Sequence, residues 1–163
     1  MNNEISKLLD QTKQSLSIAG IELLDDIKII LKRFENNNNI HDYSFLVAPA
    51  AKTYEGYLKH FFLKINLIDK RAYNGDRFRV GKALNPSLRY KHFSIYQKMS
   101  DMDEKGEELA EILWDAWKRG RNQIFHYFPN NLKKLTKDQA IERIKQILQA
   151  IIASSKFLEK NKY

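Results

Sequence analysis

Residues 43–65 read YSFLVAPAAKTYEGYLKHFFLKI, and the fold depends on this stretch more than on any other. Apolar side chains recur in it at intervals of three and four residues, the spacing that gives a helix one wide apolar face. The spacing therefore predicts a buried central helix. Pro49 lies inside the pattern and has no backbone N–H to donate, so we expect the helix to begin near Pro49 or to kink there.

The residues before this stretch also carry a helical pattern. Apolar residues from Glu4 to Phe34 follow helical spacing and are interrupted only near Gly20, which predicts two helices or one broken helix. Four asparagines at residues 36–39 follow. Asparagine competes for backbone hydrogen bonds and tolerates left-handed conformations, so this tract is expected to end the helix as a loop.

The helical spacing is lost over residues 70–84. This segment contains Asn74-Gly75-Asp76 and an alternation of charged and apolar residues at 77–80, which favours a short hairpin or an irregular loop. Asn85 and Pro86 then resemble a helix cap followed by proline at the first helical position. They predict a short helix that runs to about Lys98.

Two further helices are predicted in the remainder of the chain. Residues 104–127 form an amphipathic pattern, and Pro129 is expected to end it. Thr136 and Gln139 form a capping box ahead of a strongly amphipathic stretch that continues nearly to the carboxyl terminus.

The fold class expected from these patterns is all-α. The chain has 163 residues with only 6 Gly and 3 Pro, a length typical of one domain, 1–163. We expect a bundle of four to five helices with an irregular or hairpin insertion at 70–84, and we expect residues 1–41 to contribute its N-terminal helices.

Composition restricts the class of protein. Lys and Arg number 28 against 20 Asp and Glu, a formal charge of +8, so an acidic partner is electrostatically plausible. The absence of Cys removes disulfides and thiolate chemistry and suits a reducing compartment. The amino end does not resemble a signal peptide, and no apolar run is long enough to cross a membrane. We expect a cytoplasmic protein without membrane contact.

Several common chemistries lack their residues. The sequence has no Gly-rich phosphate loop and no Gly-x-Ser-x-Gly elbow. A partial calcium-loop pattern starts at Asp101, but Lys105 and Ile112 occupy two positions that require oxygen ligands. His41 and His60 have no second histidine at metal-binding spacing. No metal site and no cofactor are expected.

One local pattern does suggest chemistry: Arg121-Asn122-Gln-Ile-Phe-His126, at the carboxyl end of the predicted helix 104–127 and preceded by Lys118 and Arg119. Five helical residues turn about 500°, which would separate Arg121 from His126 by about 140° but Asn122 from His126 by only about 40°. Asn122 could therefore orient the imidazole. Arg121 would act in a site shared between two helices, as a two-fold dimer provides.

Arginine and histidine together suit cleavage of a phosphodiester by the 2′-hydroxyl group of RNA itself. A histidine can transfer the protons, and an arginine can hydrogen-bond to the phosphoryl oxygens as their charge grows. Such a reaction requires no metal ion. The alternative is a solvated helix end at which these cations cap free carbonyl groups.

The Arg-Asn-x-x-x-His pattern in an all-helical domain resembles the HEPN superfamily, whose members are metal-independent RNases that act as dimers. Residues 46–62 also resemble the toxins of the RNase LS type, a phage-defence toxin-antitoxin family. That family has a basic residue and a Glu three positions apart on the preceding long helix. Lys52 and Glu55 match this pair, with Lys where the family pattern has Arg, and Lys cannot bind phosphate through a planar fork.

The resemblance implies an RNA endonuclease toxin that works as a homodimer and is held by a cognate antitoxin protein. It places His126 as acid or base, Arg121 on the phosphate, Asn122 as an orienting residue, and Glu55 with Lys52 in the same pocket. RNase LS toxins carry further domains ahead of this part, so the chain is a stand-alone relative, a fragment or another HEPN lineage. The purely structural alternative for Glu55 is a surface ion pair with Lys52 or Lys59.

Two other features allow both a structural and a functional interpretation. Trp114 and Trp117 could stack on bases, but their spacing among Leu and Ile favours packing. A second basic stretch interleaves cations with aromatic residues, as single-stranded RNA grooves do, although a solvated loop has the same composition; its cations include Arg77, Arg79 and Arg89. The alternatives to an enzyme are a catalytically silent nucleic-acid-binding module and an antitoxin or adaptor.

Overall fold

The computed structural model describes residues 3–37 and 39–161, and throughout this part of the chain the regular structure is helical, without a strand. The all-α class is thereby confirmed. The α-helices are α1 (Asn3–Lys13), α2 (Ile18–Arg33), α3 (Ala48–Lys64), α4 (Lys70–Asn74), α5 (Val80–Ala83), α6 (Ile95–Ser100), α7 (Glu104–Trp117), α8 (Gln123–Phe125) and α9 (Lys137–Asn161). Shorter turns are η1 (Tyr43–Val47), η2 (Pro86–Leu88), η3 (Lys118–Asn122) and η4 (Pro129–Asn131).

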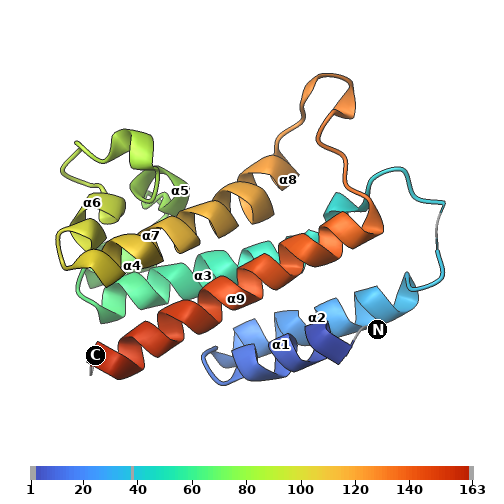
Figure 1. Ribbon diagram of the computed structural model, residues 1–163, viewed down its shortest axis with the longest axis horizontal. Helices are drawn as coiled ribbons and strands as arrows, with labels where there is room; N and C mark the ends of the chain where they lie inside the picture. The colour runs from blue at the N-terminus through green and yellow to red at the C-terminus, as the bar shows by residue number, and fades with distance from the viewer. Residues whose placement is uncertain (1–2, 38, 162–163) are drawn as a thin grey trace.

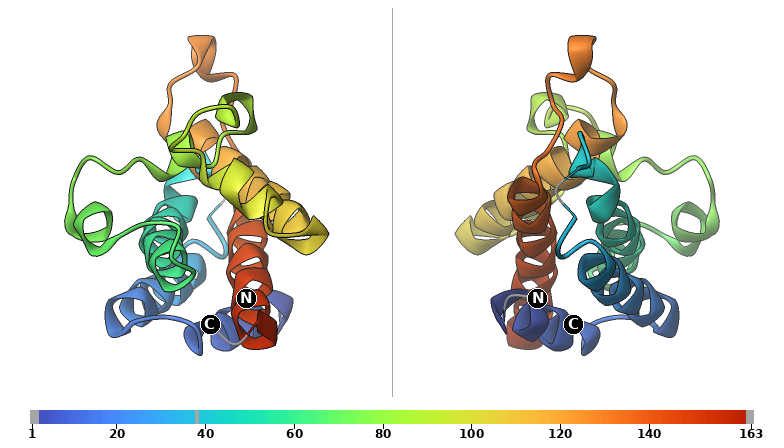
Figure 2. Two further views of the ribbon diagram at one scale, coloured as in Figure 1. Left: turned by 90° about the vertical axis from the view of Figure 1, so that its left-hand side faces the viewer. Right: turned by 90° about the vertical axis from the view of Figure 1, so that its right-hand side faces the viewer.

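Helices α3 and α9 pass through the middle of the molecule (Figure 1). Helices α1 and α2 cover one side of this pair and α7 covers the other (Figures 1 and 2). Helix α6 packs against α7, α4 packs against α3, and α5 contacts α3 and the end of α7 through Gly81. One continuous core of buried side chains links all five long helices, from Ile5 in α1 to Ile151 in α9.

Helix α3 is the buried central helix that residues 43–65 predict. A turn of 3-10 helix, η1, leads into it, and Pro49 lies in its first turn, where the missing N–H removes no helical hydrogen bond. Tyr54, Phe61 and Phe62 of α3 are completely buried. Of the two alternatives for Pro49, a helix start and a kink, the structure shows the helix start.

The amino-terminal part forms two helices, but the break differs from the predicted one. It lies at residues 14–17, where Ser17 caps α2 by accepting a hydrogen bond from the Gly20 backbone N–H. Gly20 is inside the first turn of α2 and packs on Leu16. The asparagine tract follows α2 as a non-helical segment, of which Asn38 lies outside the described residues.

The segment from 70 to 100 corrects two expectations. The hairpin is wrong: α4 and α5 occupy the insertion, which is irregular and helical. Asn85 does cap a turn by accepting from the Ser87 N–H, yet the turn is only three residues of 3-10 helix. The longer helix, α6, starts from a separate cap at Ser94, which accepts from the Gln97 N–H.

The long amphipathic pattern of residues 104–127 forms α7, the π-helical turn η3 and the short α8, which ends before Pro129 as predicted. The capping box is confirmed. The Thr136 backbone N–H donates to Gln139 Oε1 over 2.9 Å, and the Gln139 N–H donates to Thr136 Oγ1 over 3.2 Å. Judged over the described residues, none of the helices combines the length and the apolar character needed to cross a membrane.

Trp114 and Trp117 pack into the protein, as their spacing predicts. Trp117 is buried, and its indole Nε1 has no hydrogen-bond partner. Gly81 of α5 lies directly above it: a Cβ added at Gly81 would stand 2.3 Å from Trp117 Nε1. A glycine at this point lets α5 cover the indole.

Candidate functional site

The π-helical turn η3 positions Arg121. Its Gly120 is buried against α9, where an added Cβ would lie only 2.6 Å from Cδ1 of Ile147. The absence of a side chain therefore lets the turn approach α9 closely. Single π turns inside α-helices widen the helix locally and are frequent at functional sites. Here the widened turn carries Lys118, Arg119, Arg121 and Asn122.

The guanidinium group of Arg121 is held on three sides. Its Nε lies 4.0 Å from Glu55 Oε2 of α3. Its central carbon lies 5.5 Å from the centre of the Trp117 ring and 5.7 Å from that of Phe125, within range of cation–π attraction. Glu55 faces Nε, and among the described residues the two terminal amino groups of Arg121 form no hydrogen bond.

The position of Glu55 depends on the packing of α3 against α7. The hydroxyl of Tyr54, one residue earlier, donates a hydrogen bond of 3.0 Å to the backbone carbonyl of Leu113. The Tyr54 ring also lies 6.4 Å from the Trp117 ring. Burial raises the pKa of Tyr54 well above its ordinary value, so this hydroxyl stays protonated and keeps donating. Glu55 and Arg121 thus face each other across a fixed helix pair.

His126 is exposed and lies at the carboxyl end of α8, as the sequence predicts. Its backbone is extended, with φ −107° and ψ 129°. The π turn and this extended residue mean that the angles of a regular helix do not apply between Asn122 and His126. Among the described residues, no hydrogen bond joins Asn122 to His126, and neither a hydrogen bond nor a cation–ring interaction joins Arg121 to His126.

The loop that follows His126 is anchored by Asp42. This carboxylate accepts hydrogen bonds from the Ser44 N–H and hydroxyl, from Nδ2 of Asn131 at 3.0 Å and from the Leu135 N–H at 3.1 Å. Burial alone would raise the pKa of Asp42, but these four bonds outweigh burial and lower it to about 2. The loop extends outwards from α8 before it returns to α9 (Figure 1).

Lys52 does not join the other predicted site residues. It is exposed on α3, where it lines a cavity of about 710 Å³ between α3, the α1–α2 turn and the end of α9. Three helical residues turn about 300°, so Lys52 lies about 60° around α3 from Glu55. The structure therefore brings Glu55 to Arg121 and leaves Lys52 on the neighbouring face.

Lys118 and Arg119 are exposed on the same turn as Arg121. Arg119 forms an ion pair of 2.8 Å with Asp115. Arg143 of α9 joins this basic group, although the sequence pattern does not single it out. Burial and the neighbouring Arg119 guanidinium lower the pKa of Arg143 from its ordinary value.

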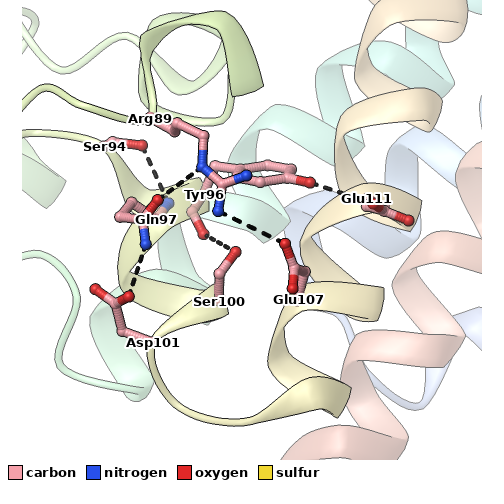
Figure 3. Close-up of polar contacts among 8 residues, drawn as sticks. All are labelled: Arg89, Ser94, Tyr96, Gln97, Ser100, Asp101, Glu107 and Glu111. Carbon is pink, nitrogen blue, oxygen red and sulfur yellow. Dashed lines mark hydrogen bonds and ion pairs between the residues drawn. The ribbon is translucent and has the colours of Figure 1, made fainter.

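The second basic stretch lies away from this turn, near α4 to α6, and two of its three arginines are engaged inside the protein. Arg89 donates to Gln97 over 2.8 Å, lies 3.6 Å from Glu107 and stands over the Tyr96 ring (Figure 3). Burial and the nearby Glu111 carboxylate raise the pKa of Tyr96, which hydrogen-bonds to Glu111. Arg89 therefore already has structural partners.

The other two arginines of this stretch differ from each other. Arg79 donates to the backbone carbonyl of Asp76. Arg77 is exposed, and the structure gives its side chain no polar partner among the described residues. Of the three, Arg77 is the cation most accessible to a ligand.

Two features of the site were not recognised from the sequence. Trp117 and Phe125 stand four residues before and after Arg121, and this spacing could have indicated an arginine flanked by rings on one helix face. The contacts of Asp42 with a loop some 90 residues later carry no local signal.

The chain matches no protein-family model, no curated protein and no solved structure at a significant level. The resemblance to the HEPN superfamily therefore rests on the residues quoted for it. Within residues 3–37 and 39–161, no group of three or more His, Asp or Glu side chains is arranged to hold a metal ion.

Proposed function

We propose that the protein is an RNA endonuclease that cleaves without a metal ion. The observation that carries this proposal is the setting of Arg121. Its Nε lies 4.0 Å from Glu55 Oε2 and its central carbon lies near two rings, while its terminal amino groups form no hydrogen bond among the described residues, and the exposed His126 follows five residues later. A positioned guanidinium and a solvent-accessible imidazole are groups that suit phosphoryl transfer once a second copy of the chain brings them together.

In the proposed reaction, the 2′-hydroxyl of the RNA attacks the adjacent phosphorus and loses its proton to a base. The bond to the 5′-oxygen breaks, and that oxygen takes up a proton from an acid. The products are a 2′,3′-cyclic phosphate and a 5′-hydroxyl end. His126 transfers one of these protons, and Arg121 donates hydrogen bonds to the phosphoryl oxygens as their negative charge increases.

The proposal includes a homodimer. One His126 serves as either acid or base, so a second copy of the chain would supply the other group, and it would bring the two Arg121–His126 pairs into one site. By resemblance to the RNase LS type, the enzyme would be the toxin of a toxin-antitoxin or phage-defence system, with RNA as its substrate, a cognate antitoxin protein as its partner and the cytoplasm as its location.

A second candidate is a catalytically silent module that binds nucleic acid or a partner protein, as an antitoxin or adaptor does. Arg121 is engaged with Glu55, Trp117 and Phe125 inside one chain and does not contact His126. This observation favours a structural arginine.

The test is incubation of labelled RNA with the purified protein in EDTA, followed by chemical analysis of the fragment ends. His126→Ala should lose cleavage while keeping the wild-type melting temperature, because His126 is exposed and makes no contacts in the core. His92→Ala is the matched control, since His92 is an exposed histidine in the loop before α6. It should cleave like wild type.

Cyclic phosphate ends produced by wild type and by His92→Ala, but not by His126→Ala, would support the endonuclease. RNA binding without cleavage by any of the three proteins would overturn it in favour of the silent module.

A further inference from the structure

The cavity of about 710 Å³ lies on a different face of α3 from Glu55 and Arg121, and the proposed nuclease site does not use it. The turn between α1 and α2, helix α3, Tyr73 of α4 and the last turns of α9 enclose it. Its volume falls in the range of small-molecule sites in proteins, about 300 to 1,000 Å³.

Four residues of α3 run along the cavity at four-residue spacing: Lys52, Gly56, His60 and Lys64. Successive residues at this spacing lie about 40° apart around a helix, so the series winds about 120° around α3 from Lys52 to Lys64. Among the described residues, Lys52 and Lys64 form no ion pair. The α3 wall of the cavity therefore carries Lys52 on one side of Gly56, and His60 and Lys64 on the other.

Folding does not account for Gly56. It lies in the middle of a long helix with an ordinary helical backbone, where glycine costs about 0.5–1 kcal/mol relative to alanine. No atom lies within 4 Å of where its Cβ would be, so no neighbouring element requires the missing side chain. What Gly56 does provide is bare helix backbone on the cavity wall between Lys52 and His60.

The opposite walls mix apolar side chains with small polar ones, among them Ser15, Ser17 and Ser155. Leu16 and Leu23 come from the α1–α2 region and Leu158 from α9, while Phe61 contributes from α3 itself. Glu159 is the acidic side chain of the lining, against two lysines and a histidine. The lining therefore combines a strip with two lysines and a histidine on α3 with leucines on the facing walls, between which small polar side chains lie.

We infer that this cavity binds a small organic anion, a carboxylate or phosphate carried on an apolar body. The anionic group lies over Gly56, where the absent side chain lets it approach between Lys52 and His60, with Lys64 one turn further along. The apolar body packs against Leu16, Leu23 and Leu158. This ligand is separate from the RNA that the proposed endonuclease would cleave.

The experiment is isothermal titration of the full chain with three probes: octanoate, phenyl phosphate and uncharged 1-octanol. Octanoate and phenyl phosphate distinguish a carboxylate from a phosphate and an alkyl from an aromatic body. We expect at least one anion to bind at least ten times more tightly than octanol and to raise the melting temperature with concentration.

Three variants locate the bound probe. Gly56→Leu should abolish binding by filling the cavity, with an unchanged or higher melting temperature, because the added side chain meets open space. Lys52→Gln with Lys64→Gln should weaken binding of the anion at least tenfold. Arg121→Gln should leave binding unchanged, so that failure of the nuclease proposal and failure of this one can be distinguished.

The inference is overturned if neither anion binds at 10 mM, if octanol binds as tightly as the anions, or if a folded Gly56→Leu variant binds like wild type.

Discussion

At the scale of single residues, Asp42 connects the start of η1 to the loop after His126. Its pKa is about 2 in the folded protein and 3.8 in the absence of these contacts. A carboxylate whose pKa is lowered by folding adds stability above its unfolded pKa, and this stability is lost as the pH falls through the folded value. The contribution is therefore complete above about pH 5 and lost towards pH 2.

We predict that Asp42→Asn lowers the free energy of unfolding at pH 7 by about 1 kcal/mol, because the amide keeps the shape of the carboxyl but not the charge that its four donors favour, and solvent screens part of that charge. The difference from wild type should shrink between about pH 4 and pH 2, where Asp42 itself becomes protonated. Urea denaturation at several pH values measures it.

Asp26→Asn is the control for this prediction, since Asp26 is an exposed carboxylate on α2. It should change the free energy of unfolding by less than about 0.5 kcal/mol at every pH. A wild-type to Asp42→Asn difference that stays constant from pH 7 to pH 2.5 would contradict the assigned role of Asp42.

The predicted site residues show which parts of the site a local sequence pattern can predict. The Arg121-to-His126 motif is correctly placed at a helix end, because apolar spacing and Pro129 locate that end. The spacing of residues along one helix does not show which of them will contact a helix that is distant in the sequence. Glu55 meets Arg121 across α3 and α7, whereas Lys52, three residues earlier, lines the cavity on the adjacent face.

At the scale of elements, η3 depends on close contact between Gly120 and Ile147. We predict that Gly120→Ala lowers the free energy of unfolding by about 1–3 kcal/mol, because the added methyl group would lie 2.6 Å from a completely buried side chain. Chemical denaturation measures this change.

Two further variants test the cause of that loss. Gly56→Ala is the matched control, and we expect it to raise the free energy of unfolding by about 0.5–1 kcal/mol, since its Cβ meets no atom within 4 Å. Ile147→Val should reduce the cost of Gly120→Ala when the two are combined. Additive effects in the double variant would rule out a direct clash.

The long helices could be predicted because each has an apolar face of several turns. The short ones could not, since their stability comes from tertiary packing more than from their own sequence. Helix α5 illustrates this: it occupies its place through Gly81 above the Trp117 ring, a contact between two segments some 35 residues apart. The π turn within α7–α8 likewise reflects packing on α9.

At the scale of the whole molecule, the formal charge is +8, and the cations that the proposed RNA would meet lie in two separate regions. Lys118, Arg119 and Arg143 gather around η3, and Arg77, near α4, has no polar partner in the part of the chain that the structure describes. Because Arg89 and Arg79 already have partners, a bound RNA would meet fewer cations than the sequence suggests. Around η3, the cations Lys118, Arg119, Arg121 and Arg143 lie together, and we therefore expect about four phosphate contacts there, of which the contact of Arg119 would compete with its ion pair to Asp115.

We predict that the affinity for single-stranded RNA falls about 50-fold between 50 and 200 mM salt, as about four phosphate contacts imply. Fluorescence anisotropy with the His126→Ala variant measures binding without cleavage. Lys118→Gln should make the slope of the logarithm of the binding constant against the logarithm of the salt concentration shallower by about 0.7. An affinity that stays flat over this range would show that RNA is not held through these cations.

The covered indole of Trp117 has a consequence for the dynamics of the whole chain. Its N–H is sealed under α5 with no acceptor, so deuterium from solvent can replace this proton only when α5 lifts away. A buried donor without a partner also weakens the closed state by about 1–3 kcal/mol, which lowers the cost of that opening. The exchange rate of the Trp117 indole proton therefore measures how often the α4–α6 segment separates from the helical core.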